Sequence, residues 1–433
     1  MTFRTTHPAV TRMAAGLGLA FAGRGAAMTA LIWVLYASSG SAWLVSAAML
    51  ATFGVSTATS PFTGHAGDRH DRRRVVVVSA IATAIALAVC APLAVAGLTI
   101  PIVIAIVVAT AIHGAISPAI QGAVPALVED DQRSAANSLV NAAKSGGFML
   151  GPGLGGALLA VIGPAGVFLG SAVMLAAAAV LVGRLHGEFR AVPHEDGPGG
   201  RMDGFRRLMS DRWLRLLTLA WALVMVGVGP VIVAEVVLAH HFAVGSLGYG
   251  LIAVFWDGGG VIGALAGHRI SRRLEQPAVV GGCAAIAFGF AVVGLTPIFW
   301  PVLLGMFISG SFDAFGVVAA QNIIQRRTPD HMRSRVSAAL DAVVLGTMAL
   351  SFTLGAPLVE LLGPQGVYLA AGGVAALAAL LMLPMLVGTS DLPPRVRATR
   401  RQIERPVRTI ARNVSYGRRR VVERVRQKAS DRV

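Results

Sequence analysis

Ionisable side chains stand inside several long apolar runs of this chain, where few kinds of chemistry justify a charge. They are Arg24, His113, Glu235, Asp257, Asp313 and Asp341. Inside a bilayer, such groups pair with one another, bind a polar solute, or pass protons between carboxylates and imidazoles. We therefore expect these residues to bind a substrate or to couple the movement of protons to it.

Most of these residues also have a structural alternative. His113 can hydrogen-bond a carbonyl of a neighbouring helix, Asp257 can join two helices, and Asp341 can cap a helix close to Arg335. Arg24 has no such simple alternative, because an arginine at the middle of a span requires a counter-ion, a water-filled cavity or an anionic substrate.

The apolar runs are of bilayer length. Apolar residues make up 55% and charged residues 13% of the 433 positions, whereas a soluble domain is about one quarter charged. Because a span needs about 20 apolar residues, we expect an all-α membrane protein with twelve transmembrane helices. The expected spans are 13–37, 42–66, 75–97, 101–124, 136–160, 164–186, 213–238, 248–268, 277–297, 299–322, 336–361 and 364–387.

Arginine occurs in alternate connections between these spans. The arginine-rich connections contain Arg69, Arg72, Arg73, Arg74, Arg133, Arg184, Arg215, Arg269, Arg272, Arg273, Arg326, Arg327, Arg333 and Arg335. Cytoplasmic loops retain arginine, so this pattern predicts a multi-pass protein of the cytoplasmic membrane with both termini in the cytoplasm. The net charge of +16 lies in these loops and in the last 40 or so residues, which favours a membrane surface over nucleic acid.

The chain repeats itself at an offset of 200 residues. Residues 163–169 read GPAGVFL and residues 363–369 read GPQGVYL, and His113 and Asp313 are equivalent positions. Six spans per repeat place the two halves about an axis along the membrane normal. We expect an N-terminal six-helix bundle over 1–187, a cytoplasmic linker over 188–212, a second six-helix bundle over 213–388 and a basic tail over 389–433.

The loop after the second expected span, residues 64–73, reads GHAGDRHDRR. It resembles the signature loop of the major facilitator superfamily, G-x-L-x-D-R-x-G-R-R, with Ala66 and Asp71 as departures. In that family the loop latches the two halves in one orientation, and the alternative is a basic loop that only sets topology. The resemblance assigns the latch to Gly64, Gly67, Asp68, Arg69, Arg72 and Arg73.

A second pattern, GFMLGPGLGG over residues 147–156, resembles the G-x-x-x-G-P-x-x-G-G pattern of antiporters in this superfamily. Ser138 stands where the fuller pattern has another glycine. Proline and glycine allow a helix to bend against a neighbour, so the alternative is a packing kink of any transporter. The residues concerned are Gly147, Gly151, Pro152, Gly155 and Gly156.

Residues 125–137 and 327–336 are similar to the enterobactin-exporter-like and macrolide-efflux-like branch of drug:proton antiporters. The resemblance implies a major facilitator fold in which spans 1, 4, 7 and 10 line a central cavity. Arg24, His113 and Asp313 would then meet there, and Asp313 would be the first candidate for the proton carrier. The implied activity is alternating-access, proton-coupled efflux of a small amphipathic drug, siderophore or secondary metabolite.

Two alternatives stay open: a carrier of another substrate or direction, lipid-linked or nutrient, and a non-transporting membrane receptor. The sequence contains no Walker-type loop, zinc-like cluster or G-x-S-x-G elbow, so we do not expect an enzyme or a cofactor other than the proton gradient. We expect a monomer with a small molecule, protons and lipids as partners, and no nucleic acid. Hydrophobic residues recur at helical spacing among the tail arginines, which indicates an amphipathic helix on the anionic inner leaflet or a disordered tail.

Overall fold

The chain folds almost entirely into long helices. The computed structural model describes residues 8–69, 71–124, 127–128, 132–185, 203–267, 270–328 and 332–387, and within these ranges it contains no strand. A helix satisfies its own backbone hydrogen bonds, which is the requirement that a lipid environment places on a spanning segment. The expected all-α fold is confirmed.

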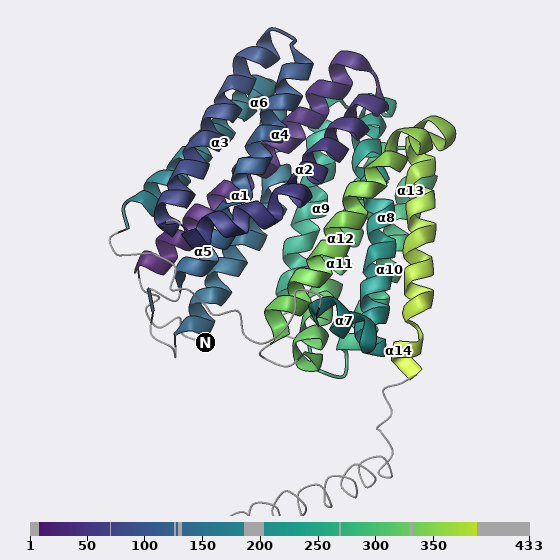
Figure 1. Ribbon diagram of the computed structural model, residues 1–433. Helices are drawn as coiled ribbons and strands as arrows, with labels where there is room; N and C mark the ends of the chain where they lie inside the picture. Colours follow the sequence, from purple (N-terminus) through teal and green to yellow (C-terminus); the bar gives the residue numbers. More distant parts are fainter. Residues whose placement is uncertain are drawn as a thin grey trace, which may run out of the picture. The chain divides into compact units, whose positions relative to one another are not determined.

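The first half of the chain, shown in purple to blue in Figure 1, contains six helices. They are α1 (Pro8–Ser39), α2 (Ala42–Arg69), α3 (Arg72–Val95), α4 (Thr99–His113), α5 (Ile116–Ala123) and α6 (Arg133–Gly183). The second half begins with a short helix that we did not predict, α7. Its elements are α7 (Asp203–Ser210), α8 (Arg212–His241), α9 (Gly245–Gly267), α10 (Glu275–Leu295), α11 (Phe299–Arg327), α12 (Arg333–Ser351), the 3-10 turn Phe352–Leu354 and α13 (Gly355–Met382).

Ten segments of the described residues are long and apolar enough to cross a membrane. Two of them, Ala136–Gly183 and Ala339–Leu386, are 48 residues long. A straight helix of that length would measure about 72 Å, more than twice the thickness of a hydrocarbon core. Each contains one glycine with non-helical backbone angles, Gly163 (φ 66°, ψ 178°) and Gly363 (φ 68°, ψ 170°). Dividing both segments at these glycines yields the twelve expected crossings.

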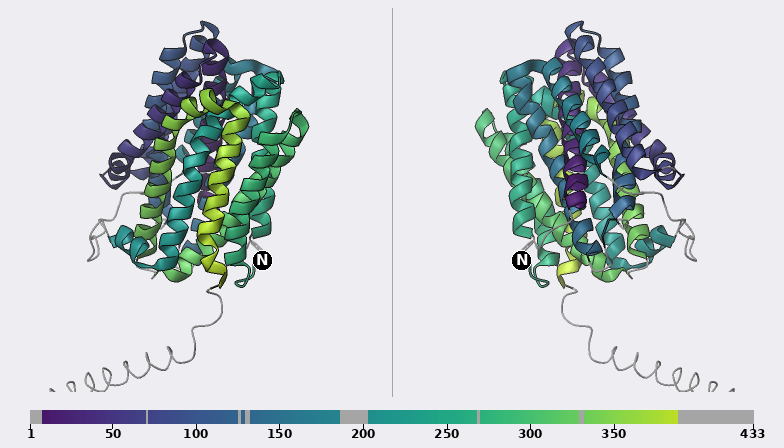
Figure 2. Two further views of the ribbon diagram at one scale, coloured as in Figure 1. Left: turned by 90° about the vertical axis from the view of Figure 1, so that its right-hand side faces the viewer. Right: turned by 90° about the vertical axis from the view of Figure 1, so that its left-hand side faces the viewer.

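The two glycines therefore form tight turns inside continuous helices. Positive φ is accessible to glycine without the penalty that a Cβ would impose, so the same residue recurs at both positions. We call residues 133–162 the first arm of α6 and residues 164–183 its second arm. Figure 2 shows the equivalent turn in α13, yellow-green, at the upper end of the left-hand view.

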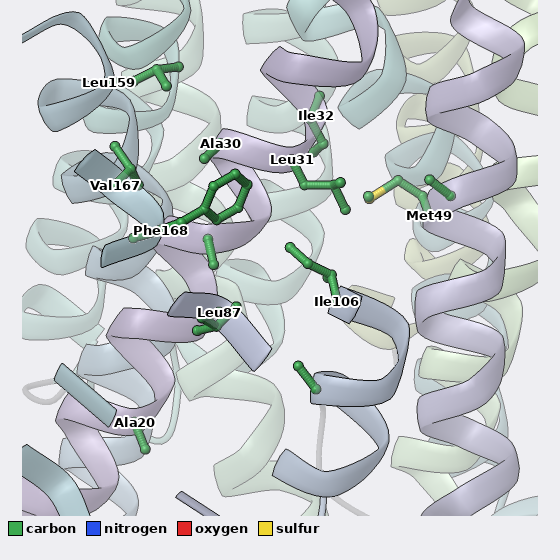
Figure 3. Packing of buried hydrophobic residues seen from close by; sticks show 14 of the residues in the cluster. Ala20, Ala30, Leu31, Ile32, Met49, Leu87, Ile106, Leu159, Val167 and Phe168 are labelled. Carbon is green, nitrogen blue, oxygen red and sulfur yellow. The ribbon is translucent and has the colours of Figure 1, made fainter. Parts of the chain in front are cut away.

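The packing inside each half follows the repeat. α1 packs on α6 in the first half, and α8 packs on α13 in the second. The second arm of α6 covers one face of α1, where Gly23 lies against Ser171 and Leu175. Figure 3 shows Phe168 of this arm beside Ala30 of α1, within the buried hydrophobic cluster. The core is therefore made by helix faces of small and aliphatic residues. This is expected in a bilayer, where the hydrophobic effect does not drive helices together and close packing of small residues does.

The fourth expected span, 101–124, is interrupted. α4 ends at His113, Gly114 and Ala115 form a turn, and α5 begins at Ile116. The break places a buried histidine at a helix C-terminus, where the last backbone carbonyls lack partners within the helix. After Leu383 the structure describes only the short helix α14 (Pro384–Val387). The expected basic tail, 389–433, lies outside the described residues.

We call the end of the bundle drawn uppermost in Figure 1 the upper end, and the opposite one the arginine-rich end. The upper end carries the turns at Gly40, Gly97, Gly163, Gly245 and Gly363, all with positive φ. The arginine-rich end carries Arg72, Arg73, Arg207, Arg326 and Arg327.

Candidate functional site

Two pockets occupy equivalent positions in the two halves. The first is lined by Arg24, Thr83 and His113 among others. The second is lined, among others, by Val224, Cys283 and Asp313. Arg24 and Val224, Thr83 and Cys283, and His113 and Asp313 are each 200 positions apart, which is the offset of the sequence repeat. The repeat has therefore preserved the place of the pocket while its polar groups have changed.

The first pocket lies between α1, α3 and α4. Its remaining lining is Ala27, Met28, Leu87, Ile106, Ala109 and Thr110. His113 is 3% exposed, and neither of its ring nitrogens has a hydrogen-bond partner among the described residues. The Nε of Arg24 is likewise buried without a partner. Buried polar groups are normally hydrogen-bonded, so two such groups in one pocket require an explanation.

A second cation lies close to this pocket. The ammonium group of Lys144, from the first arm of α6, lies 5.5 Å from the centre of the Phe21 ring. The same ring makes an edge contact with His113, with 5.1 Å between the ring centres. Arg24 and Lys144 both act electrostatically on His113. Sequence analysis missed Lys144, although a lone lysine within the expected span 136–160 was a sufficient signal.

Asp313 does not join this group. It lines the second pocket, between α8, α10 and α11, and its electrostatic neighbour there is Cys283. In this structure Arg24 and His113 line a pocket inside the first half and Asp313 lines the equivalent pocket of the second half, so the expected meeting of all three in a central cavity stays a prediction. The separation follows the repeat: α4 and α11 turn these equivalent side chains into the pocket of their own half.

The remaining acids form two further contacts. Glu235 of α8 acts electrostatically on Asp257 and Tyr249 of α9 and on Tyr368 of α13. The hydroxyl of Tyr368 is buried without a partner. Asp341 of α12 is exposed and interacts electrostatically with Lys144 of the other half. The side chain of Arg335, proposed above as its neighbour, lies outside the described residues.

Asp257 connects the two halves. Its Oδ2 accepts a hydrogen bond from the backbone N–H of Gly153 in the first arm of α6, at 2.9 Å. Asp257 is 8% exposed, so this contact lies in the interior. The structural alternative for Asp257, a contact between two helices, is therefore present in the structure. It has an additional property: the helices that it joins belong to different halves.

The glycine-rich pattern places the first arm of α6 between α1 and α9. Gly147, Gly151 and Gly155 recur every four residues and thus share one face, which lies against the backbone of α1. The Thr29 hydroxyl of α1 donates to the carbonyl of Pro152 at 3.2 Å. Gly156 lies on another face, directly against Gly250 of α9. A side chain at these positions would push the helices apart, so glycine is required for the packing.

The latch residues are described only in part. Side chains 60–69, which include Gly64, Gly67, Asp68 and Arg69, lie outside the residues whose side chains the structure describes. Arg72 donates to the carbonyl of Gly122 near the end of α5, and Arg73 donates to the carbonyl of Leu185 after α6. Both arginines thus bind backbone of the first half at the arginine-rich end.

Aromatic rings join the halves at the upper end. His240 of α8 stacks on Trp33 of α1, with 5.0 Å between ring centres, and makes an edge contact with Tyr36 at 4.8 Å. Trp33 also stacks on Tyr249 at 5.8 Å. Near the same end, Trp43 Nε1 donates to Glu360 Oε1 at 2.6 Å. None of these aromatic contacts was predicted from the sequence.

At the arginine-rich end, the polar contacts that we find among the described residues stay within one half. Arg326 pairs with Glu275, and Arg327 lies 3.5 Å from Asp211. The guanidinium of Arg207 donates to the carbonyl of Arg327 at 2.9 Å. Contacts between the halves thus extend from the upper end to the level of Asp257, and the upper end is closed.

Comparison with known proteins places this arrangement in a family. Two stretches of the chain, residues 13–344 and 297–425, match the model of the Major Facilitator Superfamily. Among curated proteins, the multidrug efflux pump Tap of Mycolicibacterium fortuitum is 28% identical over 272 residues. That alignment covers 58% of this chain and 61% of the pump.

Solved structures support the fold. The nucleoside transporter NupG superposes with a TM-score of 0.68 at 12% identity, covering 88% of this chain and 99% of that one. The human organic anion transporter MFSD10 (TETRAN) superposes with a TM-score of 0.60 at 19% identity, covering 87% of this chain and 99% of that one. At these identities the likeness concerns the fold alone. The family match, the fold and the repeated helical halves agree: the chain belongs to the Major Facilitator Superfamily.

Proposed function

We propose that this transporter exports a small amphipathic compound in exchange for protons, by alternating access. The observation that carries the proposal is the hydrogen bond from Gly153 to Asp257. This bond places an ionisable group of α9 at the contact between the halves. The group lies against the glycine-rich first arm of α6, which packs between α1 and α9. Support for efflux comes from the relative, which is itself a multidrug efflux pump.

The coupling follows from the chemistry of that contact. A carboxylate accepts a backbone hydrogen bond more strongly than a neutral carboxylic acid does, because the bond is charge-assisted. Protonation of Asp257 therefore weakens the contact between α6 and α9 and favours separation of the halves. A ligand can shift an equilibrium only by its different affinity for the two states, and a proton on Asp257 meets that condition.

The orientation of the cycle follows from the loop charges. The arginine-rich end faces the cytoplasm under the positive-inside rule, and the upper end faces the exterior. The closed upper end then makes this structure the state that is sealed toward the exterior. The two halves, 1–187 and 213–388, act as the moving bodies, and residues 64–73 act as the latch between them at the cytoplasmic face.

Asp313 is the second candidate for the proton carrier. It is an acid within a span, it lines a pocket, and it occupies the position of His113 in the repeat. Glu235 and Asp341 complete the set of acids that can exchange protons within the spans. Proton movement along such residues requires no cofactor other than the gradient.

The experiment has two stages. A growth-inhibition panel in cells that overproduce the protein selects a compound, and uptake of that compound into inside-out vesicles is then driven by an imposed proton gradient. We expect uptake that collapses when the gradient is dissipated. Asp257→Asn and Asp313→Asn separate the two candidates: the carrier's variant loses uphill uptake and keeps passive exchange. Uptake that is insensitive to the gradient in the wild-type protein would refute proton coupling.

A further inference from the structure

The pocket formed by Arg24 and His113 contains a cation, Arg24, and no acid. No carboxylate of the described residues forms an ion pair with Arg24, and its Nε is buried without a hydrogen-bond partner. Both nitrogens of His113 are also without partners. The acids of the spans do not line this pocket: Asp313 lies in the equivalent pocket of the other half, Glu235 lies with Asp257 beside α6, and Asp341 lies within electrostatic reach of Lys144.

An unpaired buried cation is costly. Removing a charge from water without pairing it costs several kcal/mol, so proteins pair such charges or use them to bind something. Here Lys144 adds a second positive group near the same histidine. The residual donors are the guanidinium N–H groups of Arg24 and at least one N–H of His113, because an imidazole carries one in every protonation state.

The pocket offers donors and no acceptor charge, which is the pattern that selects an oxyanion. Arginine binds carboxylates and phosphates through two parallel N–H groups, and a neighbouring imidazole N–H supplies a further donor. Leu87, Ile106 and Met28 form an apolar wall beside these donors. The free space beside these donors is about 10 Å³, enough for about one water molecule, so the hydrocarbon part of a bound molecule can lie against this wall only when the helices move apart.

We propose that this pocket binds the oxyanion group, a carboxylate, sulfonate or phosphate, of an amphipathic substrate. The proposal rests on the proposed transport function, which it deepens by specifying an anionic substrate class. The equivalent pocket strengthens the assignment, because it has Val224 in place of Arg24 and Asp313 in place of His113. An acid there repels an anion, so only the first half offers the site.

The test compares two probes of the same shape that differ in charge, naphthalene-2-carboxylate and naphthalene-2-carboxamide. Binding of each to the purified protein in a neutral detergent is measured by equilibrium dialysis with naphthalene fluorescence. We expect the carboxylate to bind about tenfold or more tightly than the carboxamide, the preference that one charged hydrogen-bonded contact supplies. Arg24→Gln should remove this preference, and His113→Gln should reduce it.

Arg12→Gln is the matched control, because Arg12 lies on the same helix, is exposed and carries the same charge. It should keep the carboxylate preference. Equal binding of the two probes to the wild-type protein, or an equal loss in the Arg12 and Arg24 variants, would overturn the anion site. Displacement of the carboxylate by sodium sulfate at equal affinity would also overturn the assignment to a substrate group, since the site would then hold a free inorganic anion.

Stability offers a second readout that does not need a ligand. If Arg24 is unpaired, Arg24→Gln removes a buried charge and should raise the thermal unfolding temperature of the ligand-free protein. A lower unfolding temperature would show that Arg24 has an acidic partner and would refute the proposal. Counterflow of the carboxylate in proteoliposomes separates this proposal from transport itself: selective binding without counterflow contradicts the transport function and leaves the anion site in place.

Discussion

Asp257 Oδ2 and the amide nitrogen of Gly153 are 2.9 Å apart, although the two residues are separated by 104 positions in the chain. The bond joins the residue after Pro152, in the glycine-rich arm of α6, to the middle of α9. Proline in a helix removes one backbone bond and distorts the adjacent turn. The carboxylate therefore binds the helix next to its weakest turn, where a small change in the arm has the largest effect on the contact.

Replacing Asp257 by alanine should destabilise the protein, and replacing it by asparagine, which keeps a weaker neutral hydrogen bond, should destabilise it much less. Alanine leaves the buried N–H of Gly153 without an acceptor, which costs about 1–3 kcal/mol. Asparagine keeps an oxygen at that place but cannot ionise, so it should abolish proton-driven uptake alone. Thermal unfolding in detergent and vesicle uptake measure the two effects. An Asp257→Ala variant as stable as the wild type would contradict the role of the contact.

Gly156→Ala should reduce transport strongly. The added Cβ would meet the backbone of Gly250, and neither backbone can move without shifting its helix. Overpacking of this kind costs about 1–3 kcal/mol, here at the contact that keeps the upper end closed. Transport and thermal unfolding in the variant report the loss.

Gly146→Ala is the control for that substitution. Gly146 lies in the same arm and its added Cβ would meet no atom within 4 Å. Alanine is the better helix former, so this variant should unfold at the wild-type temperature or slightly above it. If both variants lose transport equally, the loss comes from the flexibility of the arm rather than from its approach to α9.

Asp68→Asn should impair transport while insertion and abundance stay near the wild-type level. The prediction rests on the resemblance of residues 64–73 to the family's latch, and the substitution removes a charge without changing the size of the side chain. Its positive charges stay in place, so topology is preserved. Immunoblots of membranes and initial uptake rates give the two quantities. Wild-type turnover in this variant would contradict the latch role of residues 64–73 and leave the loop with a role in topology only.

Topology itself can be tested with reporter fusions. Fusions after Arg73, Arg207, Arg273 and Arg327 should report the cytoplasm, and fusions in the turn over 240–245 should report the exterior. An alkaline phosphatase reporter is active only outside the cytoplasm and a fluorescent protein only inside it, so each site has a positive signal. An exterior signal after Arg273 would contradict the map of twelve crossings.

The helices and their repeat could be predicted because each depends on many residues spread along the whole sequence. Apolar runs of bilayer length and alternating loop arginines depend on composition, which survives substitution. The offset of 200 predicted the equivalence of His113 and Asp313, and both line equivalent pockets. The connections at Gly163 and Gly363 were predicted as breaks between expected spans, although it was not predicted that a single glycine makes each turn.

The partners of the charged residues could not be predicted. Which side of a span a residue faces depends on rotations of the helix that sequence fixes only loosely, so the separate pocket that Asp313 lines in this structure was not predicted. The contact of Asp257 required the position of α6 against α9, which is set by the close approach of Gly156 and Gly250. The stacking of Trp33 on His240 could not be predicted either, because it depends on tertiary packing between segments that are distant in the sequence.

The turn at Gly163 also has a mechanical consequence. The two arms of α6 are joined by a single residue, with no slack between them. The first arm touches α9, and the second arm covers α1 from another side. A tilt imposed on the first arm must be absorbed by rotation about one pair of backbone bonds or be passed on to the second. Gly163 is thus the hinge between the two arms of α6, and the tight turn transmits motion from the first arm to the second.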